Sequence, residues 1–194
     1  MIAPSFNIAT VNTSPNCQQL VAIFDRCFRL AERTCLVAGA QEPLYRPASD
    51  EYDLHMIEFS HDYVSSALHE VAHWCVAGPE RRLQEDYGYW YAPDGRSREQ
   101  QAEFERVEVK PQALEWLFSV AAGVHFRVSA DNLDQGLGPS ETFKNAVHTE
   151  VVRLCRAGVS DRVASFCRGL LSFYHPDMTL EALLDDRHFV RSSL

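Results

Sequence analysis

Three features are scarce or missing in this chain of 194 residues, and each absence excludes a class of protein. No run approaches the roughly 18 apolar residues that a helix needs to cross a bilayer, so we expect no membrane-spanning segment. Basic residues are few: 18 Lys and Arg stand against 27 Asp and Glu, which gives a net charge of −9. A general nucleic-acid binder needs a basic surface, so we expect no direct contact with nucleic acid.

Paired cysteines are also missing, because no C-x-x-C occurs. The six thiols are scattered along the chain: Cys17, Cys27, Cys35, Cys75, Cys155 and Cys167. Residues 1–16 lack the basic and apolar regions of a secretory signal. We therefore expect reduced thiols within the core, rather than a disulfide framework or a zinc knuckle. We also expect residues 1–16 to be a loose lead-in and residues 17–194 to form a single domain.

The pattern of apolar residues predicts an α+β domain, in which helices pack a small mixed sheet. A first helix is expected over 15–33, where Ser14 can cap it and Pro15 suits its first position. Lys110-Pro111 should interrupt the helical region of 97–124, since a residue before proline disfavours the α conformation. The other expected elements are strands at 34–38, 54–59, 87–91 and 124–128, a loop at 41–53, helices at 63–77, 140–156 and 160–174, and a turn at 180–184.

The most specific pattern is His69-Glu70-Val71-Ala72-His73, an H-E-x-x-H motif within the helix predicted over 63–77. Two imidazoles four residues apart on a helix point the same way and can bind one divalent cation, as in zincin-like proteins. Glu70 lies beside the first histidine and can handle protons near the metal, which makes it the candidate catalytic residue. The alternative without a metal is two half-buried histidines that pack against Trp74.

A third metal ligand must come from another segment of the chain. The metzincin extension would need a glycine and a histidine at the next helical stations, where this chain has Val76 and Pro79. We predict Glu108 as the third ligand, because valines flank it and the apolar run that follows would carry it inward. Glu105 is the alternative third ligand, or else a hydrogen-bond partner of a histidine.

Three blocks of the sequence are long and unusual: HEVAHWCVAG at 69–78, DYGYWYAPDGR at 86–96 and FERVEVKPQALEW at 104–116. In this order they closely resemble the bacterial elongation factor P hydroxylases. The resemblance extends from about Cys17 to about Tyr174 and includes Ala130-Asp-Asn-Leu133. It implies a cytoplasmic enzyme of the translation machinery that hydroxylates a lysine of elongation factor P, the lysine that already carries a β-lysyl group.

The resemblance also implies a metal site like that of zincin-type proteins. Two histidines and one carboxylate leave coordination positions open for oxygen and substrate, as in non-haem Fe(II) oxygenases. We therefore expect an oxidoreductase of the monooxygenase type, with Fe(II) as the divalent metal and O₂ as the co-substrate. No nucleotide or 2-oxoglutarate signature is visible, so the sequence does not identify the electron donor.

Tyr87, Tyr89 and Tyr91 would share one face of the strand predicted over 87–91. One interpretation is an aromatic wall that binds the long, cationic side chain of the modified lysine. Asp86 or Asp94 would then hold its ammonium groups. The other interpretation is that this face is packed core.

Two other functions remain open. In a zinc-dependent metallohydrolase, Glu70 would be the general base that activates a metal-bound water. In an oxygenase no water needs activating, so Glu70 would orient ligands or relay protons. A metal-stabilised binding module for the translation factor would keep the ligands but would need no open coordination position.

Overall fold

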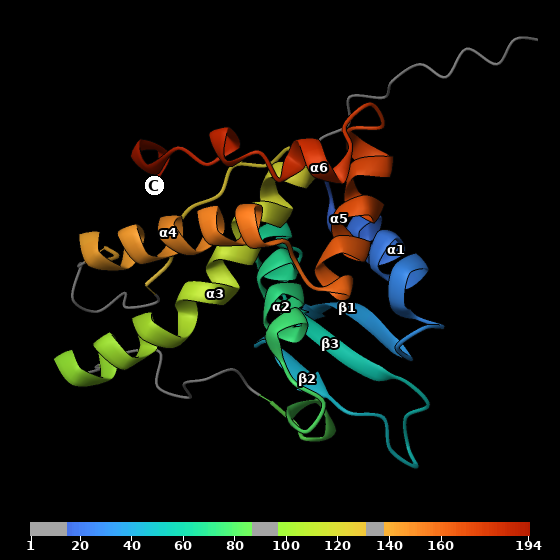
Figure 1. Ribbon diagram of the computed structural model, residues 1–194. Helices are drawn as coiled ribbons and strands as arrows, with labels where there is room; N and C mark the ends of the chain where they lie inside the picture. Colours follow the sequence, from blue (N-terminus) through green and yellow to red (C-terminus); the bar gives the residue numbers. More distant parts are fainter. Residues whose placement is uncertain (1–14, 87–96, 131–137) are drawn as a thin grey trace, which may run out of the picture.

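The computed structural model describes residues 15–86, 97–130 and 138–194 (Figure 1). Its elements, with η for a 3₁₀ turn, are α1 (Cys17–Phe28), β1 (Thr34–Ala40), β2 (Leu44–Arg46), β3 (His55–Ser60), α2 (Val64–Val76), η1 (Arg81–Leu83), α3 (Arg98–Ala122), α4 (Glu141–Ala157), α5 (Asp161–Tyr174), α6 (Leu180–Leu183), η2 (Asp186–His188) and η3 (Arg191–Ser193). The predicted α+β class with a small mixed sheet is confirmed.

The sheet has the strand order β1-β3-β2, with β1 parallel and β2 antiparallel to the central β3. In the β1–β3 register, Leu36 pairs with Ile57, and both side chains are buried. The loop predicted over 41–53 contains β2, so that expectation is only partly right. The three residues of β2 form an edge strand, and so short an edge carries too little apolar alternation to be recognised from sequence.

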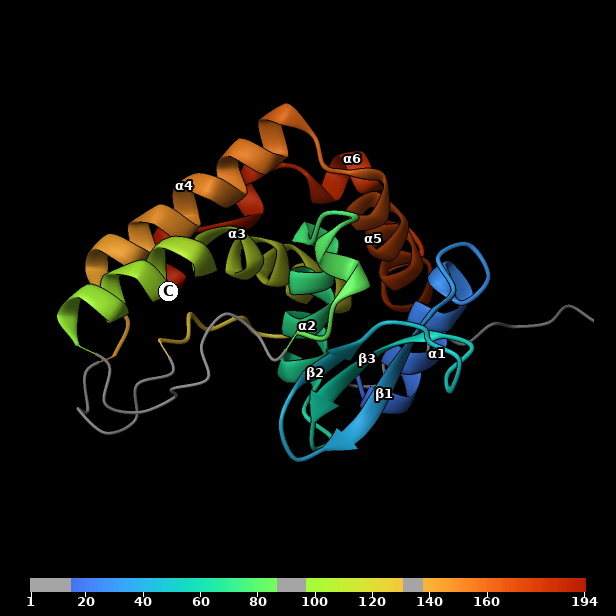
Figure 2. The ribbon, with the colours of Figure 1, turned by 90° about the horizontal axis from the view of Figure 1, so that it is seen from below.

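The motif helix α2 lies between the sheet and α3 (Figure 2). It packs on β3 from one side and on α3 from the other, while α1 contacts β1 and α5. The aromatic part of the core joins these layers: the Trp74 ring centroid lies 5.4 Å from that of Phe24 and 4.8 Å from that of Phe28. One face of α2 is thereby fixed in the core, and a second face is turned toward α3.

The longest helix, α3, runs unbroken through Pro111, so the predicted interruption at Lys110-Pro111 is wrong. Proline removes one backbone donor and costs about 3 kcal/mol within a helix. Every residue from 111 to 119 is buried, however, and burial of one large apolar side chain contributes about 1.5–3 kcal/mol. Tertiary packing here outweighs the local preference on which the prediction relied.

The start of α1 is later than expected, and the end of α2 is held by a residue of another helix. α1 begins at Cys17, because Asn16 forms a capping box with Gln19 and so takes the role expected of Ser14. α2 ends at Val76 without a left-handed glycine, since Gly78 has no positive φ. Its last carbonyls are instead satisfied by Arg162 of α5, which donates to the oxygens of Trp74 and Ala77 at 2.9 and 3.1 Å.

The strand predicted over 124–128 is not formed; residues 124–130 run beside α3 without regular structure. Gln112 of α3 holds this segment through Ser129, donating to its carbonyl at 2.7 Å and accepting from its N–H at 3.1 Å. A side chain thus supplies the bonds that a neighbouring strand would supply. The strand predicted over 87–91 lies outside the described residues.

All six cysteines are free thiols, four of them buried and two half-buried, as expected for reduced core residues. Over the three described stretches of the chain, no helix is long and apolar enough to cross a membrane. The six described helices instead bury their apolar faces in the common core.

The close approach of α1 and α5 depends on Gly169. A Cβ at this position would lie 2.8 Å from Cys27 Sγ and 3.1 Å from Ile23 Cγ2. We predict that Gly169→Ala destabilises the fold by about 1–3 kcal/mol through overpacking, although alanine is the better helix former. Urea unfolding measures this change. The double variant Cys27→Ala/Gly169→Ala should recover most of the loss, and a double variant no more stable than Gly169→Ala would refute the contact.

Candidate metal centre

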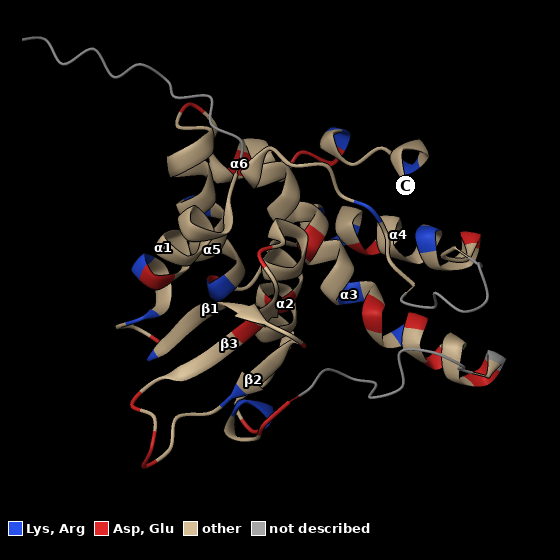
Figure 3. Ribbon diagram, turned by 180° about the vertical axis from the view of Figure 1, so that it is seen from behind, with Lys and Arg blue, Asp and Glu red and all other residues tan. Residues whose placement is uncertain are grey.

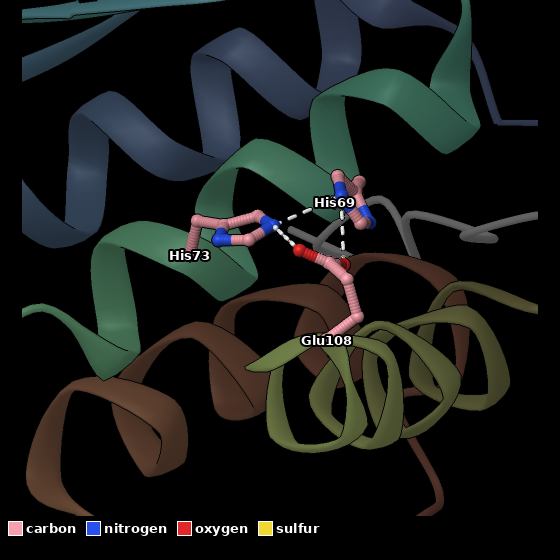
Figure 4. Close-up of side chains that lie close together, drawn as sticks. All are labelled: His69, His73 and Glu108. Atoms are coloured by element: carbon pink, nitrogen blue, oxygen red, sulfur yellow. Dashed lines mark hydrogen bonds and ion pairs between the residues drawn. The ribbon is translucent and has the colours of Figure 1, made fainter. Parts of the chain in front are cut away.

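His69 and His73 project from successive turns of α2 toward Glu108 of α3 (Figure 4). The two Nε2 atoms are 3.0 Å apart. Glu108 offers one oxygen to each imidazole, at 3.2 Å from His73 Nε2 and 3.6 Å from His69 Nε2. The structure therefore brings together the three residues that the sequence analysis selected as ligands.

These separations fit one cation between the three side chains. With ligand bonds of about 2.1 Å, two ligand atoms lie about 3.0 Å apart at an octahedral angle and about 3.4 Å apart at a tetrahedral angle. The observed values of 3.0 and 3.2 Å lie in that range, and the third, 3.6 Å, exceeds its upper end by about 0.2 Å. Within the described ranges, this is the one group of three or more His, Cys, Asp or Glu residues whose ligand atoms cluster in this way.

Glu108 is a charged residue inside the protein, with an exposed fraction of 3%. Burial alone would raise the pKa of its carboxyl. The hydrogen bond from His73, the charges of both imidazoles and the amide of Gln112 outweigh burial, and they lower this pKa to about 2. Glu108 is therefore ionised at neutral pH, as a metal ligand must be.

His69 is held from behind by Glu115, a residue that the sequence analysis missed. The distance from His69 Nδ1 to Glu115 Oε2 is 2.8 Å, so Nδ1 donates to a carboxylate while Nε2 faces Glu108. Such a partner fixes the tautomer and the ring orientation of a metal-binding histidine. Burial would lower the pKa of His69, but the bond to Glu115 and the nearby carboxylates raise it to about 10.

Gln112 is the second contact that the sequence analysis missed. Its side chain is fully buried, and its Nε2 lies 3.4 Å from Glu108 Oε2 while it also donates to the carbonyl of Ser129. Positions 108, 112 and 115 follow helical spacing and share one face of α3. That spacing from Glu108, together with the position of Glu115 inside the apolar run 113–118, could have identified Gln112 and Glu115 from the sequence.

Acidic residues mark successive turns of α3 (Figure 3), but they do not all face α2. Glu105 turns toward the start of α4, where its two oxygens accept from the hydroxyl and the backbone N–H of Ser140 at 2.7 and 3.4 Å. Ser140 in turn caps α4 by accepting from the Phe143 N–H. The structure thus places Glu105 neither beside the histidines nor as their hydrogen-bond partner.

Glu70 faces a cavity of about 430 Å³ that begins beside His73. Its side chain is half-buried, and burial raises the pKa of its carboxyl against the opposing effect of His69 and His73. Asp86 lies at the rim of the same cavity and accepts from Arg81 Nε at 2.5 Å. This pairing argues against the idea that Asp86 holds a substrate ammonium group.

The candidate substrate residues Tyr87, Tyr89 and Tyr91 lie outside the described residues, and so does Asp94. The choice between an aromatic wall and packed core therefore stays a prediction.

The fold and the site define an α+β protein of the H-E-x-x-H type, with a candidate metal centre between two helices. The sequence model of the elongation factor P hydroxylases matches residues 23–183, and the chain belongs to this family. A relative from Haemophilus influenzae, elongation factor P lysine hydroxylase, is 49% identical over 157 residues, which cover 81% of this chain and 88% of the relative.

These matches confirm the resemblance seen in the three sequence blocks. They show that the chain is an enzyme of the hydroxylase class, an oxidoreductase. The cluster of His69, His73 and Glu108 fits a metal cofactor. Neither match supports the zinc hydrolase or the binding module.

The cluster predicts which substitutions empty the site. His69→Ala, His73→Ala and Glu108→Ala should each reduce metal affinity by at least about 100-fold, because two remaining ligands hold a divalent ion weakly. Metal content after dialysis, measured by mass spectrometry, checks this. Glu105→Ala is the matched control on α3 and should keep its metal. Full occupancy in either histidine variant, or loss in Glu105→Ala alone, would contradict the ligand assignment.

The raised pKa of His69 predicts a pH dependence of metal binding. Below a pKa of about 10 the imidazole carries a proton that the cation must displace, so affinity falls as the pH falls. Zn²⁺ affinity, measured by chelator competition, should rise about tenfold per pH unit between about pH 6.5 and 8.5.

Glu115→Gln supplies the control for this effect. The amide still accepts from Nδ1 but has no charge, so the pKa of His69 falls and the pH dependence should flatten. The same slope in wild type and Glu115→Gln would show that Glu115 does not control the proton on His69.

Proposed function

We propose that this protein is a metal-dependent hydroxylase that acts on the β-lysyl-modified lysine of elongation factor P. One observation carries the proposal: in a member of the elongation factor P hydroxylase family, two histidines and a buried carboxylate meet at metal-binding separations beside a cavity. The relative from Haemophilus influenzae is named as an elongation factor P lysine hydroxylase, which supports the same substrate.

His69, His73 and Glu108 would hold the metal, and Fe(II) is our proposal for its identity. When bound, Fe(II) would supply the redox chemistry with O₂ that no amino-acid side chain can supply for an unactivated C–H bond. Two imidazoles and a carboxylate are the ligand set of non-haem Fe(II) oxygenases.

The protein's own residues prepare the site in two ways. Glu115 and Gln112 orient His69 and Glu108, so that the ligands keep their positions when substrate enters. The cavity beside His73 offers an apolar wall to the methylenes of a lysine side chain, with Ile57, Val107 and Pro111 among its lining residues. This arrangement suits a long side chain that is presented by a loop of the partner protein.

Elongation factor P, through the loop that carries the modified lysine, is therefore the partner that we propose. The cytoplasm is the proposed location, because elongation factor P acts in translation. A net charge of −9 and the cavity's apolar wall suit a protein substrate better than a nucleic acid.

The decisive experiment compares two metals on the same substrate. Protein loaded with Fe(II) and supplied with O₂ and a reductant should add one oxygen atom to the modified lysine of elongation factor P, detected by peptide mass spectrometry. Protein loaded with Zn²⁺ should be inert, because zinc has no redox chemistry. Amide cleavage by the zinc form, without oxygen incorporation by the iron form, would identify a hydrolase with Glu70 as general base.

Glu70→Gln separates the same two classes. Loss of a general base slows a hydrolase by about 10²–10⁴-fold. In the hydroxylase we expect Glu70→Gln to keep its metal and to lower kcat/KM by about 10- to 100-fold, the effect of losing one contact to a charged group. Loss of metal in Glu70→Gln would instead assign this residue to the metal site.

A further inference from the structure

The cavity beside His73 is lined by residues of α2 together with residues of β2, β3, η1 and α3. The spacing of Glu70, His73, Trp74 and Ala77 places these four residues on one side of α2, and all four line the cavity. Its volume of about 430 Å³ lies within the range of about 300–1,000 Å³ that is typical of small-molecule sites. The space thus fits one long side chain.

The three arginines of the lining are already neutralised. Arg81 donates to Asp86 at 2.5 Å and Arg82 donates to Glu32 at 2.9 Å. Arg106 makes two bonds to Glu103, at 2.5 and 2.8 Å. These guanidinium groups therefore do not set the charge that an incoming side chain meets.

Glu70 and Asp86 are the two acidic residues among the described residues that line the cavity, and Asp86 binds Arg81. The nearby Glu108 and Glu115 lie outside the lining, and each binds a histidine. Glu70 has no hydrogen bond or ion pair to any residue that the structure describes, although it is half-buried. A carboxylate that is partly removed from water gains most from a cation that enters with the ligand.

We propose that Glu70 is the binding residue for an ammonium group of the substrate, and that the cavity selects primary alkylammonium side chains. This inference rests on the proposed function and assigns to Glu70 a contact with the substrate. An ammonium group has three donors, and a β-lysyl group attached through its carboxyl carbon carries two amines. The methylenes of the ligand would then lie against Ile57, Val107 and Pro111.

The position of Glu70 also fixes where such a ligand lies along the cavity. Glu70 precedes His73 by three residues, so the two residues are just under one helical turn apart, or about 4.5 Å along α2. An ammonium group bound to Glu70 holds the attached carbon chain beside His73. The contact therefore gives both selectivity for a cation and alignment with the candidate metal centre.

Small probes test this binding without any turnover. With Zn²⁺-loaded protein, 1,5-diaminopentane should bind and pentan-1-ol should bind at least about tenfold more weakly, as followed by NMR titration. Glu70→Gln should weaken diamine binding by about tenfold or more and leave the affinity for pentan-1-ol unchanged. Metal content, measured in parallel, should equal that of the wild type.

Two further variants serve as controls. Glu58→Gln removes a carboxylate of β3 that pairs with Arg46 outside the cavity lining, so diamine affinity should not change. Lys110→Met removes a cation from the cavity lining and should tighten diamine binding by about two- to threefold. Equal diamine affinity in wild type and Glu70→Gln, or weaker binding in Lys110→Met, would overturn the proposal.

The outcome can be separated from that of the proposed function. Oxygen incorporation by the iron form, together with unchanged diamine binding in Glu70→Gln, would overturn the ammonium site and leave the hydroxylase intact. Glu70-dependent diamine binding without any oxygen incorporation would overturn the hydroxylase and leave the ammonium site intact.

Discussion

The buried carboxylate of Glu108 is the constraint on which the arrangement of α2 and α3 depends. An ionised carboxylate inside a protein costs several kcal/mol unless donors or cations surround it. At 3% exposure, Glu108 meets this requirement through His73, His69 and Gln112. The two helices can therefore pack closely only in the register that sets the histidines of α2 against this one residue of α3.

The contacts between α2 and α3 also require that α3 stays helical through Pro111. Glu108, Gln112 and Glu115 share a face only if the helix keeps its 3.6-residue period across the proline. The preference of a residue before proline for extended backbone predicted a break at Lys110-Pro111, and this same error hid Gln112 and Glu115. A local rule about proline was overridden by the burial of residues 111–119, which only the tertiary structure reveals.

The three candidate ligands could be selected from the sequence for a different reason. His69 and His73 are four apart on one helix, so their proximity follows from local geometry alone. Glu108 could be selected because apolar neighbours indicate burial, whereas the outward turn of Glu105 depends on Ser140, which lies 35 residues further along the chain. The edge strand β2 escaped prediction on similar grounds, since its partner β3 lies beyond a loop with no local signal.

The H-E-x-x-H motif alone does not choose between hydrolysis and hydroxylation, because both classes can use two histidines on one helix. The choice depends on what surrounds the glutamate. In this fold one side of α2 is fixed in the core by Ala67, Leu68 and Val71, while His69 is tied to Glu115 on α3. Glu70 is left at the cavity wall without a partner among the described residues. A carboxylate in that position can meet a cationic side chain directly, and the relative from Haemophilus influenzae is named for the hydroxylation of a lysine.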